Sequence, residues 1–457
     1  MVASAGTENS RVRRTTRTLT KRGARPWRCG AAGNARTALG LVATGVLVTL
    51  TGCGAQMARS GWTAPSTFIR PAADVSAAGS PSGREAFVWP VETQRSLNGV
   101  PISFVRARIR LPDGRLTRTQ TISRTDQVAQ APSVAFDAAG TATAVWIEGD
   151  NLHTDQIMVA VRPRGGRFGT PVAVAAPGLT RPVLAVARDG AAAIAWSRDY
   201  SRSQVVVRTP GHCASQRPRG CFGSAQSVDG GGDATVTIGP DDTAYMAWPD
   251  RCIRIAVAPH GERFESPQAI SDNSVACSQP AVAVAADGNA VIAWRASSPA
   301  SEESNRSAAI RVAVRDPRGR ISPPQTLSLA GDSPRICVNR QGEVIVLWQQ
   351  RSSDGTTLTA AVGPIGGTFG APTELSPPSD EQNVDGSLAV DHHGNAIVAY
   401  EHRGGVFARV RKPGQAFAAP TRLKTHASLA GPLIAANNKI TAVLATAAGT
   451  QLRDWTP

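Results

Sequence analysis

The sequence is poor in aromatic residues and in lysine. Aromatic side chains make up 5% of the 457 residues, so alanine, valine and glycine must supply much of the interior. Lysine occurs only at Lys21, Lys412, Lys424 and Lys439, and most of the formal net charge of +15 comes from arginine. Residues 1–52 hold nine basic residues and one acid, a net +8, which leaves the rest of the chain at +7. This moderate charge, without a basic stripe that alternates with aromatic residues, argues against nucleic-acid binding.

The motifs of common catalytic and cofactor sites are also missing. The chain has no HExxH motif, no phosphate-binding loop and no CxxC spacing. Its GSPSG segment at 79–83 has proline where a nucleophile elbow needs serine. We therefore assign no catalytic residue and expect no cofactor and no metal site.

An uncharged stretch at 38–51 follows an arginine-rich leader. It is shorter than the ~20 apolar residues of a membrane-spanning helix and is typical of a signal-peptide core. It ends in Leu50-Thr51-Gly52-Cys53, which resembles the bacterial lipobox, whose cysteine is lipidated and becomes the new N-terminus. The alternative is an uncleaved membrane anchor with an incidental cysteine. Both interpretations place the following domain outside the cytoplasm.

We therefore expect a signal peptide with a long basic leader over 1–52, a tether over 53–60 lipidated at Cys53, and the folded domain over 61–457. The predicted location is the outer face of the bacterial cytoplasmic membrane. Cysteine usage fits an oxidising space. Cys213 and Cys221 flank a short loop and are predicted to form a disulfide, whereas Cys252 and Cys277 are a second candidate pair. Cys337 alternates like a buried strand residue and is predicted to be a core residue.

A pattern of about 50 residues recurs along the chain. Each copy has an apolar stretch, a turn such as Asp-Gly, and a second apolar stretch ending on an aromatic residue, as in PAVAVAADGNAVIAW at 280–294. The aromatic ends are Trp89, Trp146, Trp196, Trp248, Trp294, Trp348 and Tyr400. A polar loop, a third apolar run and a short fourth stretch follow. The pattern predicts four short strands per repeat, which is typical of a β-propeller.

Eight first strands can be counted, and the last repeat stops after its third strand. Segment 61–69 resembles the missing fourth strand, so we expect the N-terminal strand to join the C-terminal blade and close the ring. The sequence thus predicts an all-β fold, a β-propeller of four-stranded blades. Eight blades are expected, or seven if residues 71–125 do not form a full repeat.

Two recurring residue types have structural explanations. Asp137, Asp189 and Asp287 lie early in the turns between first and second strands, where aspartate stabilises turns, and we favour this role over calcium binding. The repeated aromatic residue is expected to pack between neighbouring blades. Ligand stacking is the alternative.

The expected topology gives the domain two faces. The turn face carries the connections between first and second strands and between third and fourth strands. The N-terminal strand would enter there, so we predict that this face lies near the membrane, with basic residues against anionic lipid. Ordinary solvated turns are the alternative. Its basic residues are Arg115, Arg162, Arg164, Arg167, Arg217, Arg219, Arg263, Arg318, Arg320, Arg411 and Lys412.

The opposite, loop face carries the connections between second and third strands and between repeats. These vary in length, so this face is the expected ligand surface. Charged residues follow the repeated aromatic residues there, and we take them as ligand-binding candidates: Glu148, Arg198, Asp199, Asp250, Arg251, Arg295, Arg351, Glu401 and Arg403.

The repeats resemble those of bacterial extracellular lipoproteins with sialidase-like (BNR-type) propellers. The motifs depart from that family. Phe68-Ile69-Arg70-Pro71 has the residue types of the sialidase Phe/Tyr-Arg-Ile-Pro motif in another order, and the Ser-x-Asp-x-Gly-x-x-Trp repeat is absent. The catalytic arginines of the family therefore cannot be carried over to any position.

Two functions follow as expectations. The favoured one is a lipid-anchored propeller without catalysis that binds a cell-envelope glycan or a protein. The alternative is a sialidase-like glycoside hydrolase with a divergent active site. Two carboxylates ~5–10 Å apart beside converging arginines would favour the enzyme.

Overall fold

The computed structural model describes residues 61–69, 74–150, 154–178, 180–199, 202–208, 222–260, 262–271, 276–297, 308–380, 384, 386–391, 393–436 and 439–457. Contacts divide the chain into two units, 1–57 and 58–457, and every described residue belongs to the second. Residues 1–60 and 209–221 lie outside the described residues, so the predictions for Cys53 and for the Cys213–Cys221 disulfide stay predictions.

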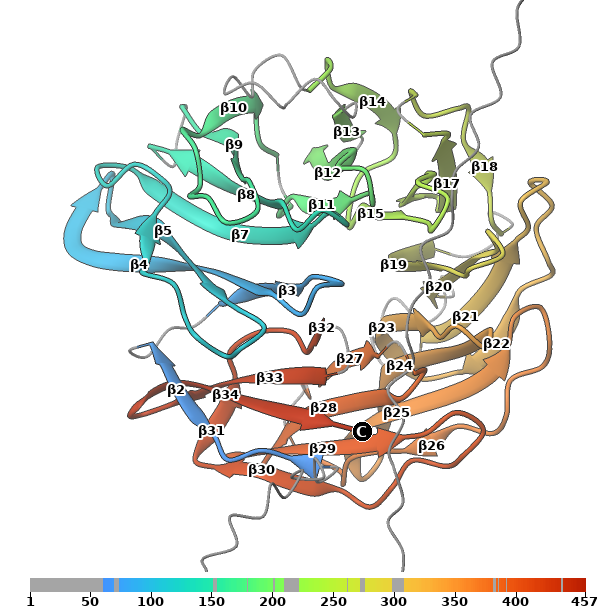
Figure 1. The fold of residues 1–457 in the computed structure, drawn as a ribbon. Helices are drawn as coiled ribbons and strands as arrows, with labels where there is room; N and C mark the ends of the chain where they lie inside the picture. The colour runs from blue at the N-terminus through green and yellow to red at the C-terminus, as the bar shows by residue number, and fades with distance from the viewer. Residues whose placement is uncertain are drawn as a thin grey trace, which may run out of the picture. The chain divides into compact units, whose positions relative to one another are not determined.

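Every regular element of the described residues is a β-strand, and these strands form seven sheets (Figure 1). We number the strands by the eight sequence repeats to which they belong. Repeat 1 contains β3 (Ser76–Gly79), β4 (Glu85–Leu97), β5 (Val100–Arg110) and β6 (Gln120–Thr121). Repeat 2 contains β7 (Val128–Phe136), β8 (Ala142–Gly149), β9 (Gln156–Arg162) and β10 (Val172–Ala175). Repeat 3 contains β11 (Val183–Val186), β12 (Ala192–Asp199), β13 (Arg202–Arg208) and β14 (Gln226–Asp229). Repeat 4 contains β15 (Thr235–Ile238), β16 (Ala244–Asp250), β17 (Cys252–Ala258) and β18 (Gln268–Ala269).

The second half of the domain continues the series. Repeat 5 contains β19 (Ala276–Val284), β20 (Ala290–Ser297), β21 (Ala308–Arg315) and β22 (Gln325–Ser328). Repeat 6 contains β23 (Gly331–Val338), β24 (Glu343–Ser352), β25 (Gly355–Pro364) and β26 (Thr373–Glu374). Repeat 7 contains β27 (Gly386–Val390), β28 (Ala396–His402), β29 (Gly405–Arg411) and β30 (Thr421–Thr425). Repeat 8 contains β31 (Ala427–Leu429), β32 (Ile434–Ala436), β33 (Lys439–Thr446) and β34 (Gly449–Thr456), together with β1 (Gly61–Trp62) and β2 (Ser66–Ile69).

The repeats form antiparallel sheets in a propeller-like arrangement (Figure 1). Repeats 3 to 7 are each a four-stranded sheet, while repeats 1 and 2 share an eight-stranded sheet through one parallel pairing of Ser103 with Val128. First strands of successive repeats contact one another in chain order from β3 to β27, β27 contacts β32, and β32 contacts β3. The all-β, four-stranded pattern expected from the sequence is therefore present.

The N-terminal segment pairs with the last strand of the chain. Gly61 lies opposite Thr456 and Trp62 opposite Trp455, and β2 continues the pairing along β34 with Thr67 opposite Gln451. The prediction that segment 61–69 pairs with the C-terminal repeat is therefore confirmed. Because Thr456 ends a third strand, Gly61 lies at the turn face.

The repeated aromatic residue packs between neighbouring sheets, as expected. Trp146, Trp196, Trp248, Trp294, Trp348 and Tyr400 are fully buried. Trp294, for example, packs on Ile253 and Ile255 of repeat 4. The alternative role, stacking on a ligand, is wrong for these residues, because complete burial leaves no ring face for a ligand.

The turns between first and second strands also follow the prediction. Gly190 and Gly288 adopt positive φ values of 95° and 81°, which a side chain would strain. The Asp189 carboxylate accepts a hydrogen bond from the backbone N–H of Ala191 at 2.9 Å, and Asp287 accepts one from Asn289 at 3.1 Å. These aspartates therefore stabilise their turns.

Arginines at the ends of third strands connect neighbouring sheets. Arg411 pairs with Glu343 of the preceding repeat at 3.0 Å, and this hydrogen-bonded contact holds the pKa of Glu343 below its usual range. Arg208 donates to Thr143 Oγ1 at 3.0 Å. Arg162 and Arg411 are each 6% exposed. These two arginines therefore lie within the interfaces between repeats rather than in open turns.

The described cysteines fall into two classes. Cys252 and Cys277 form a disulfide between repeats 4 and 5, which realises the second candidate pair. Cys337 is free, and burial raises the pKa of its thiol to about 12, so the thiol stays protonated at neutral pH. Cys337 is half-buried on β23, so the predicted core position is met only in part. None of the described residues forms a helix that could span a bilayer.

Candidate functional site

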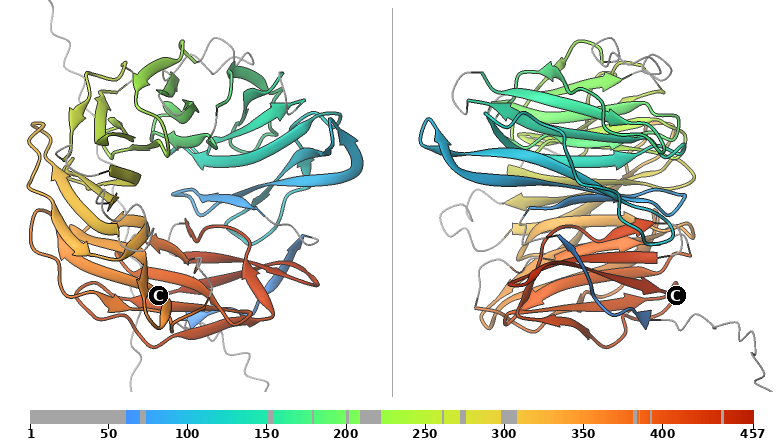
Figure 2. Two further views of the ribbon diagram at one scale, coloured as in Figure 1. Left: turned by 180° about the vertical axis from the view of Figure 1, so that it is seen from behind. Right: turned by 60° about the vertical axis from the view of Figure 1, so that its left-hand side comes forward.

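The loop face is distinguished by one long hairpin. Strands β4 and β5 contain 13 and 11 residues, whereas the next longest such pair among the described residues, β24 and β25, contains 10 each. The hairpin projects beyond its neighbours (Figure 2). Its tip is fixed to repeat 2, because the Asn98 side chain donates to the Asp150 carbonyl at 2.9 Å. The hairpin therefore forms a wall on one side of the loop face.

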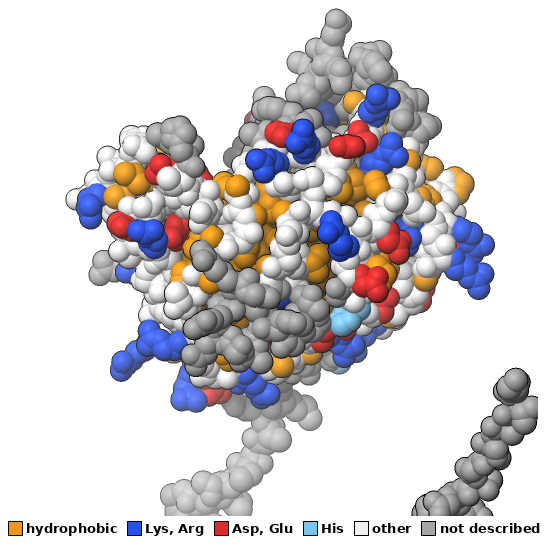
Figure 3. All heavy atoms as spheres, turned by 90° about the horizontal axis from the view of Figure 1, so that it is seen from above, with side chains coloured by type: hydrophobic (Ala, Val, Ile, Leu, Met, Phe, Trp, Pro, Cys, Tyr) orange, Lys and Arg blue, Asp and Glu red, His pale blue; other side chains and the backbone are white. Residues whose placement is uncertain are grey.

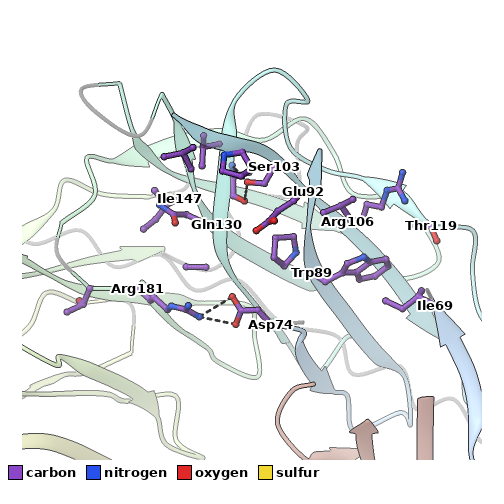
Figure 4. A pocket seen from close by; sticks show the side chains of 18 of the residues that line it. Ile69, Asp74, Trp89, Glu92, Ser103, Arg106, Thr119, Gln130, Ile147 and Arg181 are labelled. Atoms are coloured by element: carbon purple, nitrogen blue, oxygen red, sulfur yellow. Dashed lines mark hydrogen bonds and ion pairs between the residues drawn. The ribbon is translucent and has the colours of Figure 1, made fainter. Parts of the chain in front are cut away.

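A cleft of 1090 Å³ lies beside this wall (Figure 4). Repeats 1 and 2 and the chain that leads into repeat 3 contribute its lining. The lining residues include Asp74, Trp89, Glu92, Pro101, Ser103, Arg106, Thr119, Gln130, Ile147, Thr180 and Arg181. We call this site the hairpin cleft.

An ion pair crosses one end of the hairpin cleft. Arg181 Nη1 lies 2.9 Å from Asp74 Oδ1 and 3.1 Å from Oδ2, although the two residues are 107 positions apart (Figure 4). Arg181 is held in place because Thr180 Oγ1 accepts a hydrogen bond from the backbone N–H of Ser197 at 2.8 Å. Both charged side chains remain substantially exposed, 70% for Arg181 and 45% for Asp74. A ligand in the cleft can therefore reach both groups.

The floor of the hairpin cleft is built by the contact between repeats 1 and 2. The Ser103 hydroxyl donates to the Ala129 carbonyl at 2.7 Å and accepts from the Ala129 N–H at 3.0 Å. Beyond this point β7 has a bulge, and Ala131 adopts a φ of 52° in front of Pro132. The same bulge recurs in β19 and β23, where Gln279 and Ser333 precede prolines with φ values of 53° and 51°. The bulge leaves Gln130 exposed to the cleft.

The remaining lining combines polar groups with apolar surface. Glu92 is exposed on the hairpin wall, on the same strand as Trp89. The Arg106 guanidinium lies 5.1 Å from the Phe104 ring centroid, a cation–π contact. Trp89 is 4% exposed and packs edge-on against Phe68. Carboxylate, amide, guanidinium and hydroxyl groups therefore surround a partly apolar cleft.

None of the nine sequence-derived candidates lines the hairpin cleft. Several have structural roles. Glu148 is buried and accepts hydrogen bonds from Trp146 Nε1 at 2.9 Å and from the Arg124 N–H at 3.1 Å. Asp250 accepts from Arg254 Nε at 3.3 Å.

The other candidates are spread around the loop face. Glu401 accepts from the Leu429 N–H at 2.6 Å. Arg251 and Arg403 occupy tight turns with φ values of 58° and 47°. Arg198 and Asp199 end β12, where Asp199 faces Arg202. The structure therefore does not gather these residues into one site.

Two candidates do converge, on a carboxylate that the sequence did not single out. Asp332 Oδ2 lies 3.3 Å from Arg351 Nη2 and 3.6 Å from Arg295 Nε. Asp332 Oδ1 accepts a hydrogen bond from Ser333 Oγ at 3.0 Å. Arg295 and Arg351 are 18% and 32% exposed. This Asp332 cluster is a second polar site on the loop face.

One group of metal-ligand types gathers among the described residues. Donor atoms of Asp189, Asp242 and His260 lie within 4.8 Å of one another on the turn face. His260 Nε2 and Asp189 Oδ2 are 2.5 Å apart, and Asp242 accepts from the Arg188 N–H at 2.8 Å. Hydrogen bonds within the protein explain these contacts, so we assign no metal to them.

Known proteins match the chain by fold but not by sequence. No protein-family model and no curated protein matches it. The lectin BP39L from Burkholderia pseudomallei has a TM-score of 0.51 at 13% identity, covering 78% of this chain and 100% of the lectin. The polysaccharide lyase Uly1 has a TM-score of 0.49 at 10% identity, covering 87% and 99%. The microbial sialidase Hz136 has a TM-score of 0.37 at 11% identity, covering 78% and 73%. At these identities the likeness to the lectin establishes the fold alone.

Proposed function

We propose that this protein is a bacterial cell-surface β-propeller that binds a carbohydrate in the hairpin cleft. The observation that carries the proposal is the cleft itself, with polar groups from three repeats around a volume of 1090 Å³. Binding sites for small ligands are commonly ~300–1,000 Å³, so the cleft has room for more than one sugar ring.

The lining of the cleft suits sugar chemistry. Asp74, Glu92, Gln130 and Arg181 present acceptors and donors that can bond hydroxyl groups. Pro90 and Pro101 add apolar surface for the C–H faces of a sugar ring. The lectin BP39L supports only the suitability of the scaffold, so the ligand class rests on these side chains.

We propose further that the eight repeats are blades of a closed ring. Support comes from the contact of β3 with β32 and from the pairing of β1 and β2 with β34. Arg110 of repeat 1 also donates to Asp454 Oδ1 of repeat 8 at 2.7 Å, and so contacts the preceding repeat as Arg411 does. Closure would complete the last sheet with a fourth strand and leave only short outer edges.

A lipid on Cys53 would hold the ring by its turn face, where Gly61 lies. The lipobox-like sequence and the apolar stretch at 38–51 support this anchor. The Cys252–Cys277 disulfide supports an oxidising compartment outside the cytoplasm. The hairpin cleft, on the opposite face, would then be turned toward external glycans.

A glycan array probed with the purified protein tests the proposal. We expect binding to a defined subset of oligosaccharides that falls by at least about tenfold in Glu92→Gln and Arg181→Ala, because each change removes a charged hydrogen-bonding group. Arg318→Ala is the matched control, since Arg318 is exposed on the turn face and does not line the cleft. An array without any reproducible signal, or equal losses in all three variants, would rule out the hairpin cleft as a carbohydrate site.

The second candidate function is a sialidase-like glycoside hydrolase. The convergence of Arg295 and Arg351 on Asp332 is the observation that favours it. Glycoside hydrolysis usually requires a pair of carboxylates, and Asp332 alone is held between these two arginines. A panel of fluorogenic glycosides separates the two functions. Turnover that is lost in Asp332→Asn would favour the enzyme, and glycan binding without turnover favours the binding protein.

A further inference from the structure

Five third strands end in an arginine, and one of these arginines lacks the side-chain partner that the other four have. Arg110, Arg208, Arg315 and Arg411 each hydrogen-bond to a side chain of the preceding repeat: Asp454, Thr143, Gln268 and Glu343. Arg162 ends the third strand of repeat 2 in the same way and is 6% exposed. Its Nη1 atom is buried and has no hydrogen-bond partner within the described part of the chain.

A second arginine from repeat 1 lies in the same interface. Arg84 immediately precedes β4, and its Nε and Nη1 atoms are also buried without a partner among the described residues. The positive charge of Arg84 acts on Arg162, whose pKa is lowered first by burial and then by this charge. Arg162 thus lies within the field of a second guanidinium group, whereas Arg110, Arg208, Arg315 and Arg411 each have a side-chain acceptor.

A third arginine adds to the same positive region. A Cβ atom on Gly140 would lie 3.3 Å from Arg84 Nη1 and 3.8 Å from Cγ and Cδ of Arg164. The Arg84 guanidinium and the aliphatic part of the Arg164 side chain therefore both lie beside Gly140. Arg164 is exposed on the turn face, which opens the region to solvent. Within the described ranges, no carboxylate forms an ion pair with any of these three arginines.

This arrangement is unfavourable for the protein alone. A guanidinium does not lose its charge at physiological pH, so the like charges persist. Buried N–H donors without acceptors also cost free energy. An anion that offers several oxygens removes both penalties, because guanidinium groups form short, charge-assisted and often bidentate hydrogen bonds to phosphate.

We propose that Arg84, Arg162 and Arg164 form a binding site for a phosphate group between repeats 1 and 2 on the turn face. The phosphate is either a free ion or part of a phospholipid headgroup, since the chemistry is the same. The site is separate from the hairpin cleft, so its test is independent of the proposed carbohydrate function.

Titration calorimetry of the full chain with inorganic phosphate, at low ionic strength, tests the site. We expect saturable binding by the wild type and a loss of at least about tenfold in affinity for Arg84→Gln and for Arg162→Gln. Arg318→Gln is the matched control. Pro317-Arg318-Gly319 repeats the Pro163-Arg164-Gly165 turn in another blade, and the substitution removes one arginine charge, as the other two do. Phosphate should raise the melting temperature of the wild type and of the control, but not of the two interface variants. This second readout is made on folded protein, so it also exposes any variant that fails to fold.

Vesicles distinguish the two sources of phosphate. The same four proteins are mixed with phosphatidylcholine vesicles that contain or lack phosphatidylglycerol. Loss of binding to the anionic vesicles in the two interface variants alone identifies a headgroup site. Loss of free-phosphate binding with vesicle binding unchanged identifies a site for the free ion. Absence of phosphate binding by the wild type, or equal affinity in all four proteins, overturns the proposal.

Discussion

At the scale of single residues, the contact between repeats 1 and 8 is held by buried charge. Glu85 is fully buried and lies 2.9 Å from Lys439 Nζ and 3.3 Å from Arg110 Nη1. Arg110 also pairs with Asp454, and Thr441 Oγ1 lies 2.7 Å from both carboxylates. Burial raises the pKa of Asp454, but the hydrogen bond and charge of Arg110 and the charge of Lys439 outweigh it, so the pKa is lowered.

Replacing Asp454 by asparagine should therefore destabilise the protein in a pH-dependent way. At pH 7 we expect the free energy of unfolding to fall by about 3–5 kcal/mol, because buried cations lose a partner. A lowered pKa means that the contribution of Asp454 is complete above its unfolded pKa of ~3.9 and is lost as pH falls through the folded value. Urea unfolding of the wild type and the variant at pH 7 and pH 3 measures the difference between their free energies of unfolding. This difference should be smaller at pH 3. Asp113→Asn, at an exposed pair with Arg115, is the control and should change little. An equal difference in the free energy of unfolding at both pH values would contradict this explanation.

The buried aromatic residue of each repeat should be a large contributor to stability. Trp294 is 0% exposed and packs on the sheet of repeat 4. We expect Trp294→Ala to lower the free energy of unfolding by about 3–5 kcal/mol, through lost burial and the cavity left behind. Leu329→Ala is the matched control, since Leu329 is 76% exposed. Denaturant unfolding gives the free energy of unfolding of both variants. A similarly small loss in both would show that Trp294 does not stabilise the contact between repeats 4 and 5.

At the scale of elements, the sequence predicts what depends on neighbours in the chain. The turn at 285–289 and the aromatic end at Trp294 belong to one hairpin, so both could be read from a short pattern. The hairpin cleft could not be read in this way, because Asp74 and Arg181 meet only through the placement of three repeats. One feature of the sequence could have pointed to the cleft. The stretch 71–125 is longer and less regular than the other repeats, and this extra length forms the wall of the cleft.

Shortening the β4–β5 hairpin should separate binding from folding. Replacing residues 93–102 by Asn-Gly keeps the facing pair of Glu92 and Ser103 and closes it with a tight turn. We expect near-wild-type far-UV circular dichroism and an intact Cys252–Cys277 disulfide, because the removed segment projects from the loop face. Glycan binding should fall by at least about tenfold because one wall of the cleft is lost. Unchanged binding would move the ligand site away from the hairpin.

At the scale of the whole domain, charges of both signs are mixed on the face seen in Figure 3. We instead propose two local sites on opposite faces, the hairpin cleft on the loop face and the three arginines on the turn face. The sequence predicted the division into two faces from topology alone. It could not identify which charged residues are unpaired, because partners such as Glu343 for Arg411 come from another repeat.

The central claim is that eight repeats form a ring whose first and last segments share one sheet. Disulfide trapping tests it most directly. Thr67 lies opposite Gln451, and directly opposed residues of antiparallel strands have Cα atoms about 4.5–5.5 Å apart, within disulfide range. Mass spectrometry of the oxidised Thr67→Cys, Gln451→Cys variant should find these two positions linked in most molecules. Thr67→Cys with Ser428→Cys is the control, since β33 and β34 lie between β31 and β2 and no link should form. A missing link between positions 67 and 451 in folded protein, or an equal yield in the control, would contradict the closed ring.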